Sequence, residues 1–155
     1  MPLNIEAGWS KPVRLSLAPA GAIYSCDELD RLPAASGVYI FYRKHGDRLT
    51  PLYVGKTGNV RKRIVQHLDS VRLMKAIYEA EAGGKYVICC EPHVKPGQDL
   101  TAVLSVLENA LIDYFMGEGF ELKQKQGTKR PSHQISFTGN RISEKLVGRG
   151  MRARI

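Results

Sequence analysis

The stretch between residues 37 and 59 constrains the fold of this chain most strongly, because strand, turn, strand and helix-start patterns follow one another directly. Residues 38–42 are all β-branched or aromatic, which is typical of a strand. The polar residues 43–50 predict a turn, and residues 52–55 predict a second short strand. Two strands joined by one turn form a β-hairpin. Asn59 follows as a candidate helix N-cap.

Helix and strand patterns alternate through the rest of the chain. After the N-cap, apolar residues recur at helical spacing and predict a core-facing side, formed by Val60, Ile64, Leu68 and Val71. Four further segments show regular patterns: a continued or second helix at 73–82, a strand at 85–90, a long apolar helix at 99–116 and a short strand at 133–137. The sequence therefore predicts a mixed α/β fold.

The length of 155 residues is that of one compact domain. Residues 1–32 contain scattered prolines and no sustained period, so we expect an N-terminal arm there. The patterned segment 33–137 is the expected domain, and residues 138–155 are expected as a basic C-terminal tail. From residue 121 onward, nine Lys and Arg stand against two Glu, a net charge of +7. This concentration favours contact with phosphates over a merely solvated tail.

The charge balance of the whole chain favours a polyanionic partner. There are 23 Lys and Arg against 15 Asp and Glu, a net charge of +8. Nucleic acid is the first expected partner and an anionic membrane the second. We expect no membrane association, because no window approaches the roughly twenty apolar residues of a span. The three cysteines lack disulfide spacing, and the N-terminus lacks a signal-peptide pattern, so a cytoplasmic location is expected.

A carboxylate interrupts the apolar side of the long helix at 99–116. At about 100° per residue, the positions nearest to Glu108 around the helix are apolar, namely Leu104, Leu111, Ile112 and Phe115. An ionised carboxylate there costs on the order of several kcal/mol unless cations, donors or a metal satisfy it. Glu108 is therefore an edge residue whose carboxylate reaches solvent, a member of a structural salt bridge, or a functional group that faces a cleft.

Polar side chains also flank the apolar side of the first helix. Arg63 and His67 lie one turn apart beside the buried positions, whereas Arg61 and Lys62 point elsewhere and are expected as solvated charges. An Arg and a His in this arrangement could hold a phosphate and manage a proton. The simpler interpretation is a histidine hydrogen bonded at the edge of the core.

Two tyrosines lie on the predicted hairpin. Tyr39 points opposite to Val38 and Ile40, and Tyr53 lies near the end of the second strand. Tyrosines on a hairpin usually pack, with their hydroxyls at the surface. In a cleft with cations they could instead offer phenolic oxygens to a water nucleophile.

The tripeptides Gly37-Val38-Tyr39 and Tyr53-Val54-Gly55, with residues 56–63 after them, resemble the GIY-YIG nuclease domain. The likeness covers about residues 34–127. Each tripeptide alone would mean little, but the ordered combination is specific. The superfamily includes the incision subunit of bacterial nucleotide excision repair, some homing endonucleases and some restriction enzymes.

The resemblance assigns three functional positions. The family's catalytic arginine lies ten residues after the second tyrosine and corresponds to Arg63, which would clamp the scissile phosphate. The histidine that several branches carry four residues later corresponds to His67. The glutamate of the later helix corresponds to Glu108, which would hold one divalent cation, Mg²⁺ or Mn²⁺.

The resemblance also implies a fold and a reaction. The fold is a small central antiparallel three-stranded β-sheet flanked by helices, and the reaction is endonucleolytic hydrolysis of phosphodiester bonds in DNA. Tyr39 or Tyr53 would position and deprotonate the attacking water, helped by His67 or Lys56. Lys56 and Arg63 would supply the positive field that a phenol needs to act as a base near neutral pH.

One family feature is missing. The family usually has an asparagine shortly after the glutamate helix, whereas here Leu122 is followed by Lys123 and Gln124. Gln124 could substitute for it, Asn140 could fold back to the site, or the site is impaired. The alternative function is therefore a catalytically weak or inactive nucleic-acid-binding module of the same fold.

Substrate contacts are expected from polar residues near the site and from the basic region after the long helix: Lys56, Lys123, Gln124, Lys129 and Arg130. DNA is the expected substrate, with RNA as an open alternative. Because one active site cuts one strand, the chain is expected to act as a monomer that nicks or as a homodimer that cuts both strands.

Overall fold

A computed structural model describes residues 3–18, 23–80, 82–122 and 132–154. At its centre, β4 (Gly37–His45) lies between β5 (Arg48–Thr57) and β6 (Gly84–His93), and both pairings are antiparallel. The mixed α/β fold and its central antiparallel sheet are thus confirmed. The turn predicted at 43–50 is much shorter, because the hairpin strands pair up to His45 and Arg48.

The sheet has more strands than the three expected. β1 (Asn4–Trp9) and β2 (Val13–Leu17) pair with opposite ends of β6, and β3 (Tyr24–Ser25) pairs with β2. β7 (Ser132–Thr138) runs parallel to β1, and β8 (Gly150–Arg154) is antiparallel to β7. All eight strands belong to one sheet.

The segments expected as an arm and a tail therefore contribute to the fold. In β1, Ile5, Ala7 and Trp9 are buried while the residues between them are not, which is the alternation of a half-buried strand. Six residues were too few to stand out as a period in the sequence. The boundaries proposed at 32/33 and 137/138 stay predictions, but neither flanking segment lies apart from the sheet.

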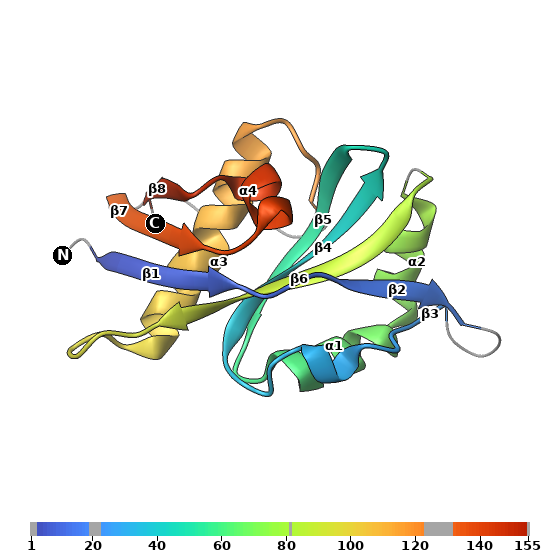
Figure 1. Cartoon of the computed structure of the whole chain (residues 1–155), viewed down its shortest axis with the longest axis horizontal. Coiled ribbons are helices and arrows are strands. Elements are labelled where there is room, and N and C mark those ends of the chain that lie inside the picture. The colour runs from blue at the N-terminus through green and yellow to red at the C-terminus, as the bar shows by residue number, and fades with distance from the viewer. Residues whose placement is uncertain (1–2, 19–22, 81, 123–131, 155) are drawn as a thin grey trace.

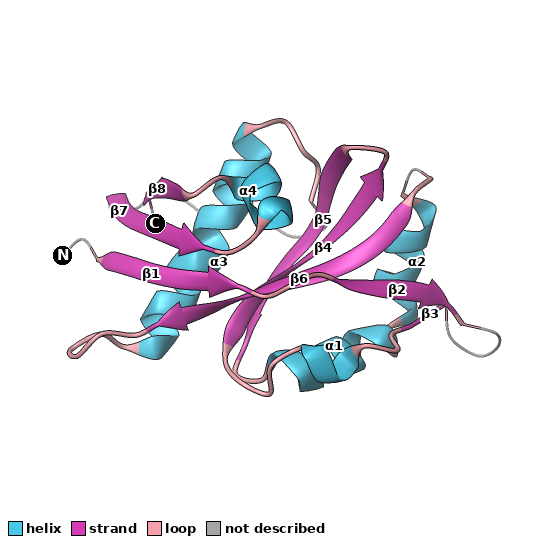
Figure 2. Cartoon of the chain, in the orientation of Figure 1, coloured by secondary structure: helices cyan, strands magenta, loops and turns pink. Residues whose placement is uncertain are grey.

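Helices cover both faces of this sheet (Figures 1 and 2). α1 (Val60–Leu68) and α2 (Val71–Glu79) pack on one face, with the short 3₁₀ helix η1 (Leu29–Arg31) before β4. α3 (Leu100–Gly117) and α4 (Arg141–Val147) pack on the other face. The chain thus has two hydrophobic clusters, one on each side of the central strands.

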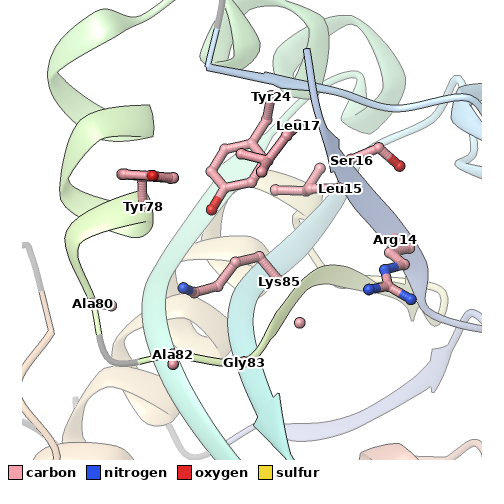
Figure 3. Close-up of a pocket in the computed structure, with 11 residues that line it drawn as sticks. Arg14, Leu15, Ser16, Leu17, Tyr24, Tyr78, Ala80, Ala82, Gly83 and Lys85 are labelled. Atoms are coloured by element: carbon pink, nitrogen blue, oxygen red, sulfur yellow. The ribbon is translucent and has the colours of Figure 1, made fainter. Parts of the chain in front are cut away.

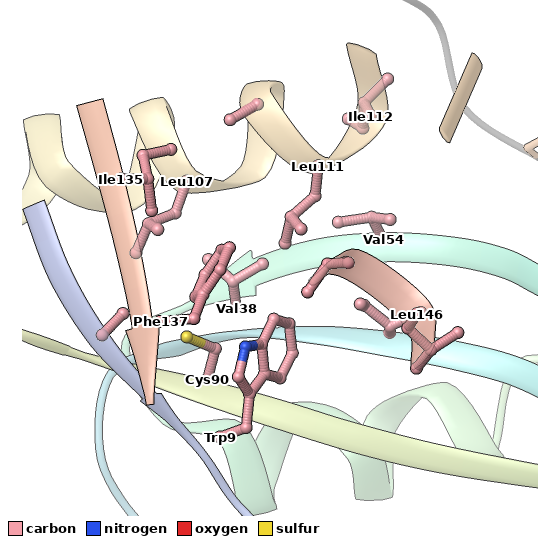
Figure 4. Packing of buried hydrophobic residues seen from close by; sticks show 14 of the residues in the cluster. Trp9, Val38, Val54, Cys90, Leu107, Leu111, Ile112, Ile135, Phe137 and Leu146 are labelled. Atoms are coloured by element: carbon pink, nitrogen blue, oxygen red, sulfur yellow. The ribbon is translucent and has the colours of Figure 1, made fainter. Parts of the chain in front are cut away.

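The cluster under α3 joins the flanking strands to the centre. Figure 4 shows Leu107 and Leu111 of α3 in one cluster with Val38, Cys90 and Phe137. The ring centroids of Trp9 and Phe137 are 5.3 Å apart. Burial on the order of 25 cal/mol per Å² of apolar surface makes this contact a substantial source of stability.

The apolar side predicted for the first helix ends earlier than expected. Val60 and Ile64 are buried, but Val71 is 69% exposed. α1 ends at Leu68, and Ser70 starts a new helix by accepting a hydrogen bond from the backbone N–H of Leu73. Because the break changes the helix direction, the spacing counted from Val60 does not carry over to Val71.

In the described part of the chain, α3 is the one helix whose length and composition would let it cross a membrane, although the sequence was expected to contain no such window. Eight of its residues are buried in the folded domain. The same pattern is typical of a core helix.

Candidate active site

Tyr39 of β4 and Tyr53 of β5 lie on the face of the sheet that α1 covers. In the hairpin register, Tyr39 is opposite Gly55, and Tyr53 is opposite Phe41. The two tyrosine rings are stacked, with centroids 6.3 Å apart and an interplanar angle of 25°. Tyr39 is buried, whereas Tyr53 is only half-buried. Of the two phenols, Tyr53 therefore has the better access to solvent.

Close approaches explain the outer glycines of the two tripeptides. A Cβ atom on Gly55 would overlap the Tyr39 hydroxyl that lies against it. A Cβ atom on Gly37 would lie 2.7 Å from the carbonyl oxygen of Cys90 and 2.9 Å from the side chain of Val60. Only glycine leaves room for the Tyr39 ring at one position and for the first turn of α1 at the other.

His67 is the buried partner of Tyr39. Its Nε2 atom lies 2.6 Å from the Tyr39 hydroxyl, and the ring also packs edge-on against Phe41 and Tyr53. Burial, together with the positive charge of Arg63, lowers the pKa of His67 to about 4. The imidazole is therefore neutral near pH 7, with a proton on one ring nitrogen and a lone pair on the other, and it shares one hydrogen bond with the Tyr39 hydroxyl.

The Tyr39 phenol is held in its protonated form. Burial raises its pKa well above the ordinary value, and the negative charge of Glu108 acts in the same direction. A hydrogen bond with the Arg63 guanidinium lowers the pKa but does not outweigh burial. Tyr39 is thus better suited to donating a hydrogen bond than to acting as a base.

Arg63 lies on the exposed side of this group. Its side chain is exposed, and its Nη1 donates to Oε1 of Gln66 at 3.1 Å. A solvent-facing guanidinium next to a buried hydroxyl is free to form bidentate hydrogen bonds with an incoming phosphate.

Glu108 on α3 and Lys56 on β5 interact with each other. Glu108 is half-buried on α3, and burial raises its pKa, whereas the Lys56 ammonium and backbone N–H act to lower it. The Lys56 Nζ donates to the hydroxyl of Ser105, one turn before Glu108, at 2.6 Å. Ser105 had no signal of its own in the sequence apart from this i, i+3 spacing. The exposed lysine therefore ties the end of β5 to α3.

The Tyr39 hydroxyl links two elements of the candidate site. It is hydrogen bonded to His67 of α1, and the charges of Arg63 and Glu108 both act on it. β4 and α1 are thus in direct contact here, whereas Glu108 of α3 acts on the hydroxyl through its charge. Within the described residues, no group of three or more His, Cys, Asp and Glu side chains forms a complete metal cage. Glu108 is the carboxylate that borders the site.

Four of the predicted substrate contacts lie outside the described residues, namely Lys123, Gln124, Lys129 and Arg130. The proposal that Asn140 folds back to the site is wrong. Its side chain caps α4 by accepting from the backbone N–H groups of Ile142 and Ser143, and its amide donates to the carbonyl oxygen of Ser10 at 2.9 Å. These bonds use both ends of the side chain in the fold.

Arg61 is not the solvated charge that its place on the helix predicts. Its Nε donates to the carbonyl oxygen of Leu32 at 2.9 Å, and its Nη2 donates to that of Asp30 at 3.0 Å. The backbone N–H of Arg61 also reaches the carbonyl oxygen of Pro33. Arg61 thus anchors the segment before β4 to the start of α1, and no sequence pattern revealed these distant acceptors.

The comparison with protein families matches this part of the chain. Residues 35–94 match the model of the GIY-YIG catalytic domain, which covers both tripeptides, α1 and α2. This segment of the chain is therefore a match to the GIY-YIG catalytic domain. The matched segment ends before α3, so Glu108 lies outside it.

The GIY-YIG segment is also similar to excinuclease Cho from Escherichia coli K12 and from Shigella flexneri. In both, 46% of residues are identical over 55 residues, which cover 32% of this chain and 18% of the relative. The chain therefore matches less than a fifth of the length of these relatives. No solved structure matches it significantly.

Proposed function

We propose that this protein is a metal-dependent endonuclease that hydrolyses phosphodiester bonds in DNA. The observation that carries the proposal is the surroundings of the Tyr39 hydroxyl, which His67, Arg63 and Glu108 all influence. The GIY-YIG domain and the similarity to excinuclease Cho support a nuclease. The positive net charge of +8 supports a nucleic-acid substrate, with DNA favoured over RNA by that similarity.

Arg63 is the proposed phosphate clamp. Its exposed guanidinium can reach two oxygens of the scissile phosphate and offset the charge that builds on them in the transition state. Lys56, exposed on the other side of the site, would contact a neighbouring phosphate. Lys123, Gln124, Lys129 and Arg130 are proposed to extend the substrate contacts.

Tyr53 is the tyrosine that is proposed to deprotonate the attacking water. It is the more accessible phenol, whereas the Tyr39 hydroxyl is buried and already hydrogen bonded to His67. Tyr53 in its deprotonated form would accept the proton of the water. The Tyr39–His67 pair would then be a positioning pair that holds the Tyr53 ring through stacking and edge contacts.

Glu108 fits a divalent cation such as Mg²⁺ or Mn²⁺. It is a half-buried carboxylate whose pKa is raised by burial, so a cation beside it would relieve a desolvated charge. Mg²⁺ prefers oxygen ligands, usually binds few protein carboxylates and completes its shell with waters and phosphate oxygens. When bound, the ion would stabilise the leaving oxygen.

A divalent-metal titration with labelled DNA tests this proposal. We expect Mg²⁺ or Mn²⁺ to support nicking, and Arg63→Ala and Glu108→Gln each to reduce the rate by roughly 10²–10³-fold or more. Arg72→Ala and Glu79→Gln are matched controls, because both residues are exposed on α2, and both should leave the rate unchanged. Cleavage that survives both site substitutions would refute the proposal.

Substitution tests the role of Tyr53. Tyr53→Phe should abolish most cleavage, because it removes the phenolic oxygen that would accept the proton of the water. Cleavage by Tyr53→Phe at the wild-type rate would exclude Tyr53 as the base.

A second candidate function is a nucleic-acid-binding module with weak or no catalysis. The use of Asn140 as a helix cap favours it, because this side chain does not supply the missing family asparagine. It predicts salt-sensitive binding of DNA or RNA without metal-dependent turnover.

Sedimentation of the protein with nicked and intact duplexes would distinguish a nicking monomer from a homodimer. The cytoplasm stays the proposed location.

A further inference from the structure

A second pocket opens on the face of the sheet that α1 and α2 cover, between β2, β3 and the end of α2 (Figure 3). Its volume is about 720 Å³, which is within the range of small-molecule sites of roughly 300–1,000 Å³. None of the residues that line it belongs to the candidate active site. Leu15 and Leu17 form an apolar wall, and the side-chain-free backbone of Gly83 and Gly84 borders the opposite side.

Two tyrosines line this pocket. Tyr24 is buried, whereas Tyr78 is 54% exposed, and their ring centroids are 6.3 Å apart. Figure 3 shows both rings beside the same space, which also receives the side chain of Lys85. An exposed tyrosine ring next to an apolar wall offers a flat surface on which another planar ring can stack.

Of the two cations that line the pocket, Arg14 has its guanidinium 5.8 Å from the ring centroid of Tyr86, which packs on the other face of the sheet, so Lys85 is the cation that faces the two tyrosines. Among the described residues that line the pocket, none is acidic. The pocket therefore suits a ligand that combines a planar ring with negative charge.

We propose that this pocket binds one unpaired nucleotide of the nucleic-acid strand that the protein acts on, with its base on Tyr78 and its phosphate facing Lys85. The inference rests on the proposed function and adds a substrate class, because a base within a duplex is not free to stack on a side chain. Lys85 lies four residues along β6 from Cys89, which pairs with Tyr39. That separation is about 13 Å at roughly 3.3 Å per residue, so one strand can reach both sites.

Metal-free binding of labelled DNA tests the inference separately from catalysis. The full chain in EDTA is titrated against a short single-stranded oligonucleotide and a blunt duplex of the same sequence, with fluorescence anisotropy as the readout. Tyr78→Ala should weaken single-strand binding by roughly 5- to 150-fold and leave duplex binding unchanged. Tyr78→Phe should bind as the wild type does, because it keeps the ring.

Matched controls use exposed residues. Val71→Ala removes another exposed apolar side chain from α2, two turns from Tyr78, and should change nothing. Lys85→Met, in contrast, should weaken single-strand binding and reduce its dependence on salt. Thermal unfolding of each variant verifies the fold.

The outcomes separate this inference from the proposed function. Equal binding of single strands by Tyr78→Ala and wild type, or an equal loss on both DNA forms, refutes the pocket even if the wild type cuts DNA. A selective loss supports it even if no cleavage occurs. Equilibrium dialysis with dAMP distinguishes the source of the nucleotide, because binding of dAMP as tight as that of the oligonucleotide would assign the pocket to a free nucleotide and refute a strand contact.

Discussion

Replacing His67 with glutamine should remove much of the acid sensitivity of folding in this protein. His67 is buried, 7% exposed, and its pKa is lowered from 6.5 to about 4. As pH falls, the unfolded chain takes up a proton near pH 6.5, while the folded protein takes it up only near pH 4. The free energy of unfolding is therefore undiminished above about pH 6.5 and falls as pH decreases toward 4.

The magnitude follows from the same two values. A tenfold change in proton concentration corresponds to about 1.4 kcal/mol, so the loss between pH 7 and pH 5 is about 2 kcal/mol and exceeds about 3 kcal/mol below pH 4. For a chain of 155 residues, about 2 kcal/mol corresponds to a decrease of Tm of roughly 4–8 °C. Carboxylates contribute mainly at the lower end of this range.

Urea unfolding followed by circular dichroism at pH 7, 6 and 5 measures this dependence. Wild type and His67→Gln are compared by the difference between their pH slopes, because the substitution also changes stability at every pH. His45→Gln, in the exposed part of the hairpin, is the matched control and should keep the wild-type slope. Equal slopes for wild type and His67→Gln would refute the burial of a neutral imidazole.

Three further substitutions probe other parts of the structure. Gly55→Ala should leave the chain folded, as judged by circular dichroism, but displace the Tyr39 hydroxyl. Because small misplacements at a site have large effects on rate, cleavage in a nicking assay should fall by roughly 10²-fold. Unchanged cleavage would contradict the close contact. Arg61→Ala should lose about 1.5–3 kcal/mol in urea unfolding, because it removes hydrogen bonds from a charged donor to two backbone carbonyl groups; a loss below about 0.5 kcal/mol would mean that these bonds are not formed in solution. Asn140→Ala should lose about 1–2 kcal/mol through its cap and its bond to Ser10, with cleavage unchanged at a temperature where it is folded; a selective loss of cleavage would return Asn140 to the site.

The central strands and helices follow from local patterns that this chain carries clearly. The β-branched and aromatic run at 38–42, the cap at Asn59 and the apolar side of α3 act over a few residues, so periodicity and capping reveal them. The same periodicity placed Glu108 among the apolar positions of the helix, and the structure has its carboxylate half-buried. Strand β1 was not predicted, because an alternation over six residues is too short to identify a strand, and β1 is held by pairing with the distant strands β6 and β7.

Local patterns revealed which side chains of β4 and α3 face the core, because the periods of helices and strands are local properties of the backbone. Tertiary contacts instead pair Tyr39 with His67 and make Arg61 the anchor of a loop, while Arg63 stays exposed. Both outcomes depend on contacts across about 28 or 29 positions of the chain. Such contacts form only when packing on the sheet brings the elements together, and no local period encodes that distance.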